Sequence, residues 1–452
     1  MPTRSTFFRV ILAGCLLFSA LARAQTNIFS HPLSRADAIE LALKQNSAIL
    51  KGKADLRISY GIEVQLRAIV LPQLTLGGGY NALESSLVEN FPLPAPLSQY
   101  IQFPNQNWNA EVKVQQSIYS GGRMRSALRS AKLTREQALL NYQTVLADTL
   151  LSVRLAYEDI LLAARQIEVN QASVQLLSRE LEDEQKRFKA GTTPQFDVLR
   201  AQVAVANERP LLIQAKNNYR LSKNNLLNLL GTDLPPTIWE DVPVELSGSL
   251  EALPYKIDLT EALQQALQKR PELAALRKAR ALRQEDLITA RAGYKPAAQV
   301  YGGYEWQSLP YENNLDADLS GWIAGAQVSW NLFDGGLTRG KIIEAQARYD
   351  RSQLDIDDSG RQIELDVRTA YSNFIEAREL LDSQALVQEQ AAEALRLAGA
   401  RLGSGSGTQL DVLDAQTALT QARATQAQAL HDYAAARARL QRALGEDMEI
   451  KN

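Results

Sequence analysis

The hydrophobic positions along the chain follow two patterns, and each pattern occurs twice. Apolar residues recur at spacings of three and four over residues 123–190, which contain no glycine or proline. The same spacing covers residues 361–398 and 408–444. This periodicity is typical of coiled-coil helices, and at about 1.5 Å per residue the first stretch would form a rod of roughly 100 Å. The sequence therefore predicts long antiparallel helical hairpins.

Shorter segments alternate apolar and polar side chains with the period of two that is typical of β-strands. Residues 108–119 and 322–333 do so, and each has aromatic residues near its ends. We expect two β-hairpins, over about residues 73–119 and 297–333, of the kind found in outer-membrane barrels. An ordinary half-buried hairpin of a soluble protein is the alternative. Four strands cannot close a barrel, because eight is the usual minimum, so copies of the chain would have to share one.

The two halves of the chain repeat each other. Residues 38–80 align with residues 262–304 at one constant offset, and a second constant offset applies from residue 117 onward. A repeat of this length is a duplicated half-molecule, not a solenoid unit. The expected fold is mainly α, with a β-barrel part. The predicted organisation is a signal peptide (1–24), a first repeat (25–230) with a helical hairpin at 123–230, a proline-rich linker (231–258), a second repeat (259–445) with a helical hairpin at 337–445, and a C-terminal tail (446–452).

Local signals refine these helices. Each repeat is expected to open with one helix, capped by Ser34 in the first and by Thr260 in the second. Pro210 is expected to interrupt and kink the returning helix of the first repeat. Gly360 is expected to bend the long helix of the second repeat.

The N-terminus indicates export. Residues 1–24 have a positive start, a short apolar run and a small-x-small ending at Ala24, which is typical of a secretory signal. Cys15 is the chain's only cysteine, and Leu12–Cys15 also fits a lipoprotein processing box, so lipidation is an alternative to cleavage after Ala24. No later window has an apolar run long enough for a spanning helix. The protein is therefore expected in the periplasm, the outer membrane or the medium.

Composition and motifs exclude several function classes. Lys and Arg number 49 against 51 Asp and Glu, so there is no basic excess for nucleic-acid binding. His31 and His431 lack zinc-ligand spacing, and Asp355–Asp358 is interpreted as a solvated acidic face. Gly335–Lys341 resembles a phosphate-binding loop, but Ile342 stands where Ser or Thr is needed. We therefore expect no enzyme activity, no metal and no cofactor.

The two predicted helical turns carry the most specific local signal. In both, an arginine stands four residues before a glycine, and an acidic residue opens the next helix. An acid in the first turn stabilises a helix by about 0.3–1 kcal/mol, which explains part of the pattern. The repeated residues are Arg187, Gly191 and Asp197 in the first half and Arg401, Gly405 and Asp411 in the second.

The doubled turn motif, the tandem halves and the signature Asn331-Leu332-Phe333-Asp334-Gly335-Gly336 together resemble TolC-type outer-membrane efflux proteins, over roughly residues 33–446. The resemblance implies a homotrimer in the outer membrane of a Gram-negative bacterium, with a twelve-stranded barrel, a long periplasmic helical tunnel and contact with outer-membrane lipid. It implies a passive exit duct of a tripartite efflux or type I secretion system. Its partners would be a periplasmic adaptor and an inner-membrane pump of the RND or ABC type.

The resemblance also implies roles for particular residues. Asp411 and Asp414 would form an acidic aperture, where six crowded carboxylates repel one another and favour cations or closure. Gly407 stands where the family pattern has an arginine that helps lock the closed state, which leaves the lock here open. The cargo is also open: drugs, metal ions or a secreted polypeptide. The alternative class is a non-channel envelope coiled-coil scaffold or adaptor. The implied adaptor-docking residues are Arg187, Gly191, Asp197, Arg401 and Gly405, and the implied strand-to-helix turns are Gly121, Gly122, Gly335 and Gly336.

Overall fold

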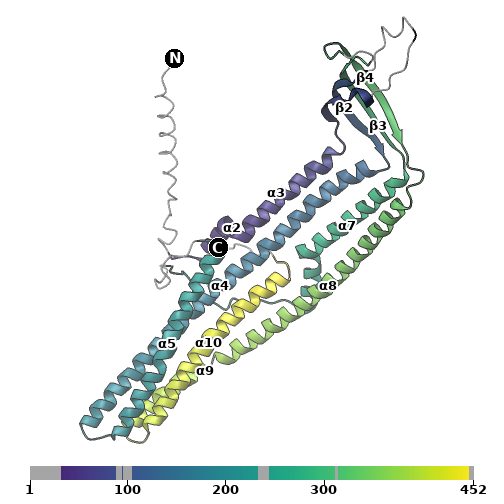
Figure 1. The fold of residues 1–452 in the computed structure, drawn as a ribbon. Coiled ribbons are helices and arrows are strands. Elements are labelled where there is room, and N and C mark those ends of the chain that lie inside the picture. Colours follow the sequence, from purple (N-terminus) through teal and green to yellow (C-terminus); the bar gives the residue numbers. More distant parts are fainter. Residues whose placement is uncertain (1–31, 88–93, 95–103, 233–243, 311–313, 447–452) are drawn as a thin grey trace, which may run out of the picture.

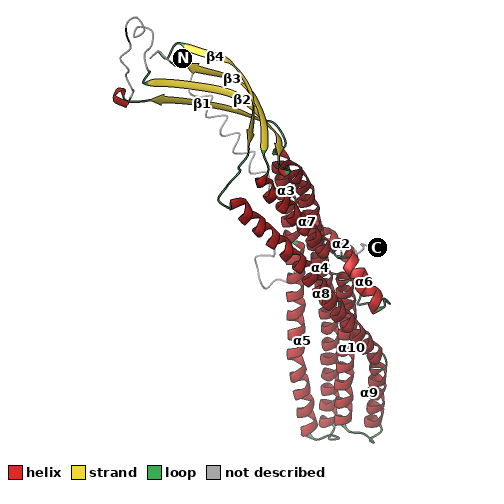
Figure 2. Ribbon diagram, turned by 90° about the vertical axis from the view of Figure 1, so that its right-hand side faces the viewer, coloured by secondary structure: helices red, strands yellow, loops and turns green. Residues whose placement is uncertain are grey.

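The computed structural model describes residues 32–87, 94, 104–232, 244–310 and 314–446. The predicted signal peptide, Cys15 and nearly all of the predicted tail lie outside these ranges. The described chain forms a long helical rod with a small sheet at one end and two helical turns at the other (Figure 1, Figure 2). A mainly helical chain with a small antiparallel sheet is what the sequence predicted.

Both repeats run from two short helices through two strands to a long helical hairpin, whose first arm is one helix in the first repeat and two in the second. The first repeat holds α2 (Arg35–Gln45), α3 (Ser47–Ala68), β1 (Gln73–Ala82), η1 (Ser85–Leu87), β2 (Gln106–Ser120), α4 (Arg123–Lys189) and α5 (Gln195–Leu230). The second holds α6 (Leu259–Lys269), α7 (Pro271–Arg291), η3 (Ala292–Tyr294), β3 (Ala297–Ser308), β4 (Asp318–Ser329), α8 (Leu337–Gln384), α9 (Val387–Gly403) and α10 (Gln409–Ala443).

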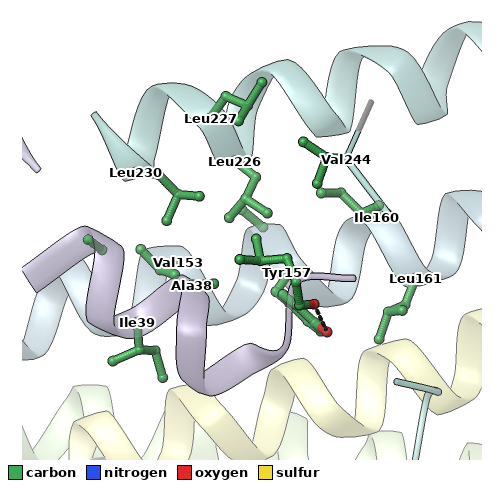
Figure 3. Packing of buried hydrophobic residues seen from close by; sticks show 13 residues of the cluster. Ala38, Ile39, Val153, Tyr157, Ile160, Leu161, Leu226, Leu227, Leu230 and Val244 are labelled. Carbon is green, nitrogen blue, oxygen red and sulfur yellow. Dashed lines mark hydrogen bonds between the residues drawn. The ribbon is translucent and has the colours of Figure 1, made fainter. Parts of the chain in front are cut away.

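Each repeat has its own apolar core midway along the rod, and the two cores use equivalent residues. The first lies between α2, α4 and α5, and the second between α6, α8 and α10. In the first core the Tyr157 hydroxyl lies 3.0 Å from the carbonyl oxygen of Leu33, within hydrogen-bond distance (Figure 3). It also lies 2.6 Å from the Ser247 carbonyl oxygen, so its single proton is shared between the two acceptors. The matched core positions are Ala38 and Ala262, Ala42 and Ala266, Val153 and Val367, Leu226 and Leu440, and Leu230 and Leu444.

The described part of the linker packs on the first core. Val244 is buried within it, and Leu246 forms an isolated parallel bridge with Leu33. The Leu33 N–H donates to the Glu245 carbonyl at 2.7 Å. The linker therefore lacks helices and strands of its own in this part, as predicted, but it lies fixed along the rod.

The sheet is antiparallel, with strand order β1-β2-β3-β4 and a bulge in β2 between Ser117 and Tyr119. Its two faces differ. One face carries a ladder of bonded amides, in which Gln299 joins Gln115 at 2.6 Å and Gln327 at 2.9 Å. The opposite face exposes apolar side chains. These include Leu74, Leu76, Trp322 and Val328.

The two repeats meet where α4 packs against α7 and α10. Arg129 of α4 binds both carboxylate oxygens of the buried Glu285 of α7, at 2.6 and 2.8 Å. The Ser126 hydroxyl donates to the Glu285 backbone carbonyl at 2.9 Å. In the helical part, α4 of the first repeat therefore holds the second repeat in place, and in the sheet the β2–β3 pairing joins the two repeats.

Several local predictions are wrong. Asp258 caps α6, because its carboxylate accepts the Thr260 N–H, so Thr260 is not the cap. β4 ends at Ser329, before the predicted end of the second hairpin. α5 continues through Pro210, so the predicted interruption is wrong, whereas the predicted kink stays a prediction.

The helix breaks also fall at unpredicted places. α8 continues through Gly360, and the long helix of the second repeat is instead divided at Ala385–Leu386. The opening helix of each repeat is divided in two, at Asn46 and at Arg270. Asn46 caps α3 because its side chain accepts the N–H groups of Ala48 and Ile49.

Candidate functional site

The turn between α4 and α5 lies at the end of the rod away from the sheet (Figure 2). The Gly191 N–H donates to the Phe188 carbonyl and the Thr192 N–H to the Arg187 carbonyl, both at 3.0 Å. This is the Schellman arrangement, which places the glycine in the left-handed region; φ of Gly191 is 76°. A Cβ added to Gly191 would meet no atom within 4 Å, so backbone conformation alone selects glycine.

The turn between α9 and α10 has the same construction. The Gly405 N–H donates to the Leu402 carbonyl at 3.1 Å, and the Ser406 N–H donates to the Arg401 carbonyl at 2.9 Å. Gly407 adds a second N–H to the same Arg401 carbonyl at 3.0 Å. In both turns the arginine closes the helix through its backbone, so the turn itself does not require an arginine side chain.

The two arginine side chains differ in their contacts. Arg187 pairs with Glu184 at 3.1 Å, and the Glu184 side chain is only 2% exposed. Arg401 is exposed and makes no ion pair with any residue in the described ranges. The first arginine is therefore anchored to its own helix, whereas the second is free to meet a partner.

The acidic residues after the turns are partly engaged in capping. The Asp411 carboxylate accepts the Thr408 N–H at 2.9 Å, and the Thr408 hydroxyl accepts the Asp411 N–H at 3.2 Å. The backbone and side-chain hydrogen bonds with Thr408 hold the pKa of Asp411 below its usual range, and Arg401 adds to this. At the equivalent place, Asp197 accepts a hydrogen bond from the Thr193 hydroxyl at 3.1 Å.

Asp414 lies one helical turn beyond Asp411 and is exposed as well. Residues three apart share a helix face, so both carboxylates point to the same side of α10. Asp411 is also needed for the cap, whereas no described residue binds Asp414. Asp414 is therefore the more available of the two carboxylates.

The two turns lie side by side at the end of the rod (Figure 1). Leu413 of α10 packs against Leu177 of α4 and Val205 of α5. The side chain of the buried Gln409 donates to the Asp197 carbonyl at 3.4 Å. The structure thus brings together the residues predicted for the first and second tips.

The glycine pairs mark the strand-to-helix turns at the other end of α4 and α8. Gly121, Gly122, Gly335 and Gly336 all have positive φ. The Asp334 carboxylate accepts the N–H of Gly336 at 3.0 Å and that of Thr338 at 2.8 Å. A phosphate bound at this turn would need these N–H groups, but Asp334 already occupies them. The geometry therefore does not favour a phosphate-binding loop here.

Sequence reasoning missed one titratable site, at the contact between α4 and α10. Nε2 of the half-buried His431 lies 2.8 Å from Asp159, and its Nδ1 lies 3.0 Å from Asp432. Burial alone lowers the pKa of His431, but the hydrogen bonds with Asp159 and Asp432 outweigh burial and raise it overall. No sequence signal could have found the pair, because Asp159 lies 272 residues away.

The described helices include none that is long and apolar enough to cross a membrane. Across the same residues, no three His, Cys, Asp or Glu side chains gather as metal ligands.

Comparison with known proteins identifies the chain's relatives. A model of the family described as "Outer membrane efflux protein" matches residues 38–232 and 262–446, one match for each repeat. The outer membrane protein TolC of Vibrio cholerae is 25% identical, over 91% of this chain and 90% of that protein. The alkaline protease secretion protein AprF of Pseudomonas aeruginosa is 26% identical, over 67% of this chain and 63% of that protein.

Solved structures agree on the fold. The outer-membrane channel OprN superposes with a TM-score of 0.76 at 19% identity, covering 91% of this chain and 90% of that chain. The outer membrane protein VceC of Vibrio cholerae superposes with a TM-score of 0.75 at 20% identity, covering 92% of this chain and 97% of that chain.

The family match settles the general predictions. Its members are channels of the Gram-negative outer membrane that act as exit ducts of efflux and type I secretion systems. TolC-type channels are homotrimers that pair with periplasmic adaptors and inner-membrane pumps. The predicted fold class, location and duct function are confirmed, and the scaffold alternative is not supported. The chain belongs to the outer membrane efflux protein family.

Proposed function

We propose that three copies of this chain share one barrel, with Asp411 and Asp414 narrowing the far end of the duct. The sheet is the observation that supports the shared barrel most. One face is apolar and exposed, the other carries the glutamine ladder, and β1 and β4 each have one strand neighbour in the described chain. Four strands with two open edges cannot close, whereas twelve strands from three copies can.

In this proposal the duct is passive. The chain carries out no chemistry and holds no cofactor, and an inner-membrane pump supplies the energy. The helical rod spans the periplasm, since α4 alone has 67 residues and would reach roughly 100 Å. The sheet then lies in the outer membrane with its glutamine face toward the lumen.

The tips are the proposed docking surface for the adaptor. Their residues are Arg187, Gly191, Asp197, Arg401 and Gly405. Both glycines are exposed and have open space where a Cβ would stand, so a partner could approach the backbone closely. The free guanidinium of Arg401 offers a charged contact for an acidic group of the adaptor.

The proposed aperture follows from the exposed acidic face of α10. Three copies would bring six carboxylates around one axis. The combined field of these like charges would favour cations over anions at the narrowed end of the duct. Because Asp411 also caps its helix, a substitution there changes both the cap and the charge.

The aperture is best tested at Asp414. We expect the Asp414→Asn variant, with Asp411 intact, to show altered conductance or weaker cation preference in a planar lipid bilayer. Asn removes the charge with little change in shape, and the cap of α10 is untouched. The measurement is single-channel conductance together with the reversal potential in a salt gradient.

A matched control removes an exposed acid elsewhere on the rod. Asp355 of α8 lies far from the tips, so the Asp355→Asn variant should conduct like the unmodified protein. If the Asp414→Asn channel also keeps both its conductance and its selectivity, Asp414 does not line the aperture.

A further inference from the structure

A polar cavity of about 470 Å³ lies where the sheet meets the helices. Ser120, Ala297 and Ser329 line it from the ends of β2, β3 and β4, and they are neighbours in the sheet, since Ala297 pairs with both serines. α4, α7 and α8 supply the other walls. The cavity is therefore shared between the two repeats.

The parity of the strands shows on which side of the sheet this cavity opens. Side chains two residues apart on a strand point to the same face. Ser329 is two residues from Gln327, and Ala297 is two residues from Gln299. Gln299 and Gln327 belong to the glutamine ladder, so the cavity lies on the polar face, which the proposed duct turns toward the lumen.

Three cations in this cavity are uncompensated. Arg123, Lys295 and Lys341 line it, are exposed, and form no ion pair within the described part of the chain. They come from the start of α4, the segment before β3 and the first turns of α8. Three cationic groups from separate elements thus converge on one space.

The other charged groups of the lining are already paired. Asp286 binds Arg283 at 2.9 Å, and Glu344 binds Arg348 at 2.5 Å. Counting Arg348, the lining holds four cations and two carboxylates, a net charge of +2 at neutral pH. Anions in the cavity would therefore meet an excess of positive charge.

The repeat shows that the turn does not need these charges. At the equivalent position Lys341 is replaced by Ala127, Arg123 by Leu337 and Lys295 by Leu71. At each of these three positions, one strand-to-helix turn therefore forms with an apolar residue where the other turn has a cation. The three cations are therefore a feature of this cavity and not of the fold.

We propose that the cavity binds anionic groups of solutes in the lumen, either phosphate or carboxylate. Two or three ammonium and guanidinium groups around one small space suit a compact oxyanion. In a trimer the three cavities would form a cationic ring at the top of the tunnel, opposite in sign to the proposed aperture. The lumenal placement rests on the proposed duct, whereas anion binding itself does not.

The binding test uses the purified full-length protein in detergent with inorganic phosphate as the probe. Phosphate binding, followed by ³¹P NMR line broadening, should weaken on the order of tenfold in a Lys295→Gln/Lys341→Gln variant, because two uncompensated charges are removed. The matched control is Arg339→Gln, an exposed cation two residues from Lys341 that does not line the cavity. Equal phosphate binding by the double variant would overturn the proposal.

Two further measurements separate the possible sources of the anion. In a planar bilayer the double variant should shift the reversal potential toward cations, in the direction opposite to Asp414→Asn. Binding that appears only in nanodiscs with phosphatidylglycerol, and not with free phosphate, would mean a lipid headgroup site and overturn the lumenal assignment. If phosphate binds as expected but no channel forms, the duct fails and the anion site stands. If the channel conducts but phosphate does not bind, the anion site fails and the duct stands.

Discussion

The two repeats close their helical hairpins with the same turn but support the arm before that turn differently. In the first repeat, α4 runs unbroken from Arg123 to Lys189 and still buries Leu177 and Glu184 near its end. In the second repeat, the arm is divided between α8 and α9, and α9 buries none of its residues. The first hairpin is therefore held by contacts within its own chain.

The second hairpin depends more on its surroundings. Leu386, Val387 and Leu397 are exposed along and just before α9. Few buried contacts mean a low local free energy of opening, and exposed apolar side chains mark a surface that a neighbour can cover. The two repeats thus share the turn but not the packing of the arm before it. A neighbouring molecule in the assembly can therefore set the position of α9 more easily than that of the end of α4.

The largest expected difference between the repeats is in the folding free energy lost when a glycine of the strand-to-helix turn is replaced by alanine. Gly121 and Gly335 have nearly equal φ, 67° and 66°. A Cβ on Gly121 would lie 2.9 Å from the Ala292 carbonyl oxygen and 2.9 Å from the Lys295 Cβ, whereas a Cβ on Gly335 would meet nothing within 4 Å. We expect Gly335→Ala to cost about 1–2 kcal/mol of folding free energy from backbone strain alone. Gly121→Ala should add to this strain an overpacking cost of about 1–3 kcal/mol.

The measurement is the midpoint of heat denaturation of the detergent-solubilised protein, followed by far-UV circular dichroism. Each alanine variant serves as the control for the other, because the backbone conformations match. Equal losses at both positions would show that the neighbouring copy crowds Gly335 in the assembly, or that Ala292 can move away from Gly121.

The sequence predicted what the repeat itself encodes. The turn glycines, the helical periodicity and the strand alternation are local patterns that occur twice, so each copy supports the other. The helix breaks were not predictable in the same way. Ala385 and Leu386 favour helix, and only the loss of packing partners beyond them marks the end of α8. Asp and Thr are both good N-cap residues, so the sequence alone did not distinguish Asp258, the actual N-cap of α6, from Thr260.

The missed sites have a common physical cause. The cationic cavity combines Arg123 of the first repeat with Lys295 and Lys341 of the second. His431 meets Asp159 across the contact between the repeats. Such contacts depend on how α4 docks against α7, α8 and α10, and no spacing along the chain encodes that.

Replacing the two tip arginines by alanine should produce a smaller difference in folding free energy. Arg187→Ala removes the ion-pair partner of the buried Glu184 and should cost about 1–3 kcal/mol of folding free energy. Arg401→Ala removes no ion pair that the described chain contains, so its effect should stay within about 0.5 kcal/mol. Heat denaturation again measures both.

A second substitution and a binding readout sharpen this comparison. Adding Glu184→Ala to Arg187→Ala should recover part of the lost stability, since the buried charge is gone. Arg401→Ala should reduce cross-linking to the periplasmic adaptor while the trimer keeps its melting midpoint. A stable Arg401→Ala trimer with full adaptor cross-linking would remove Arg401 from the proposed docking surface.

The smallest expected difference concerns pH at the contact between α4 and α10. His431 lies between Asp159 and Asp432, whereas the equivalent residues are Asn373, Asn217 and Asn218. The pKa of folded His431 is raised above its unfolded value, because its hydrogen bonds with the two carboxylates outweigh burial. Its stabilising contribution should therefore be complete below about pH 6.5 and should be lost as the pH rises through the folded pKa.

The His431→Asn variant gives this contact the residue of the equivalent position. We expect its melting midpoint to match the unmodified protein at high pH and to fall below it under acidic conditions, where the protonated imidazole stabilises the contact. The control is Asp432→Asn, which keeps the Asp159 bond and should retain part of the pH dependence. A His431→Asn protein with the unmodified protein's full pH dependence would assign the effect to other groups at this contact, such as the buried Glu158 of α4, whose pKa burial raises.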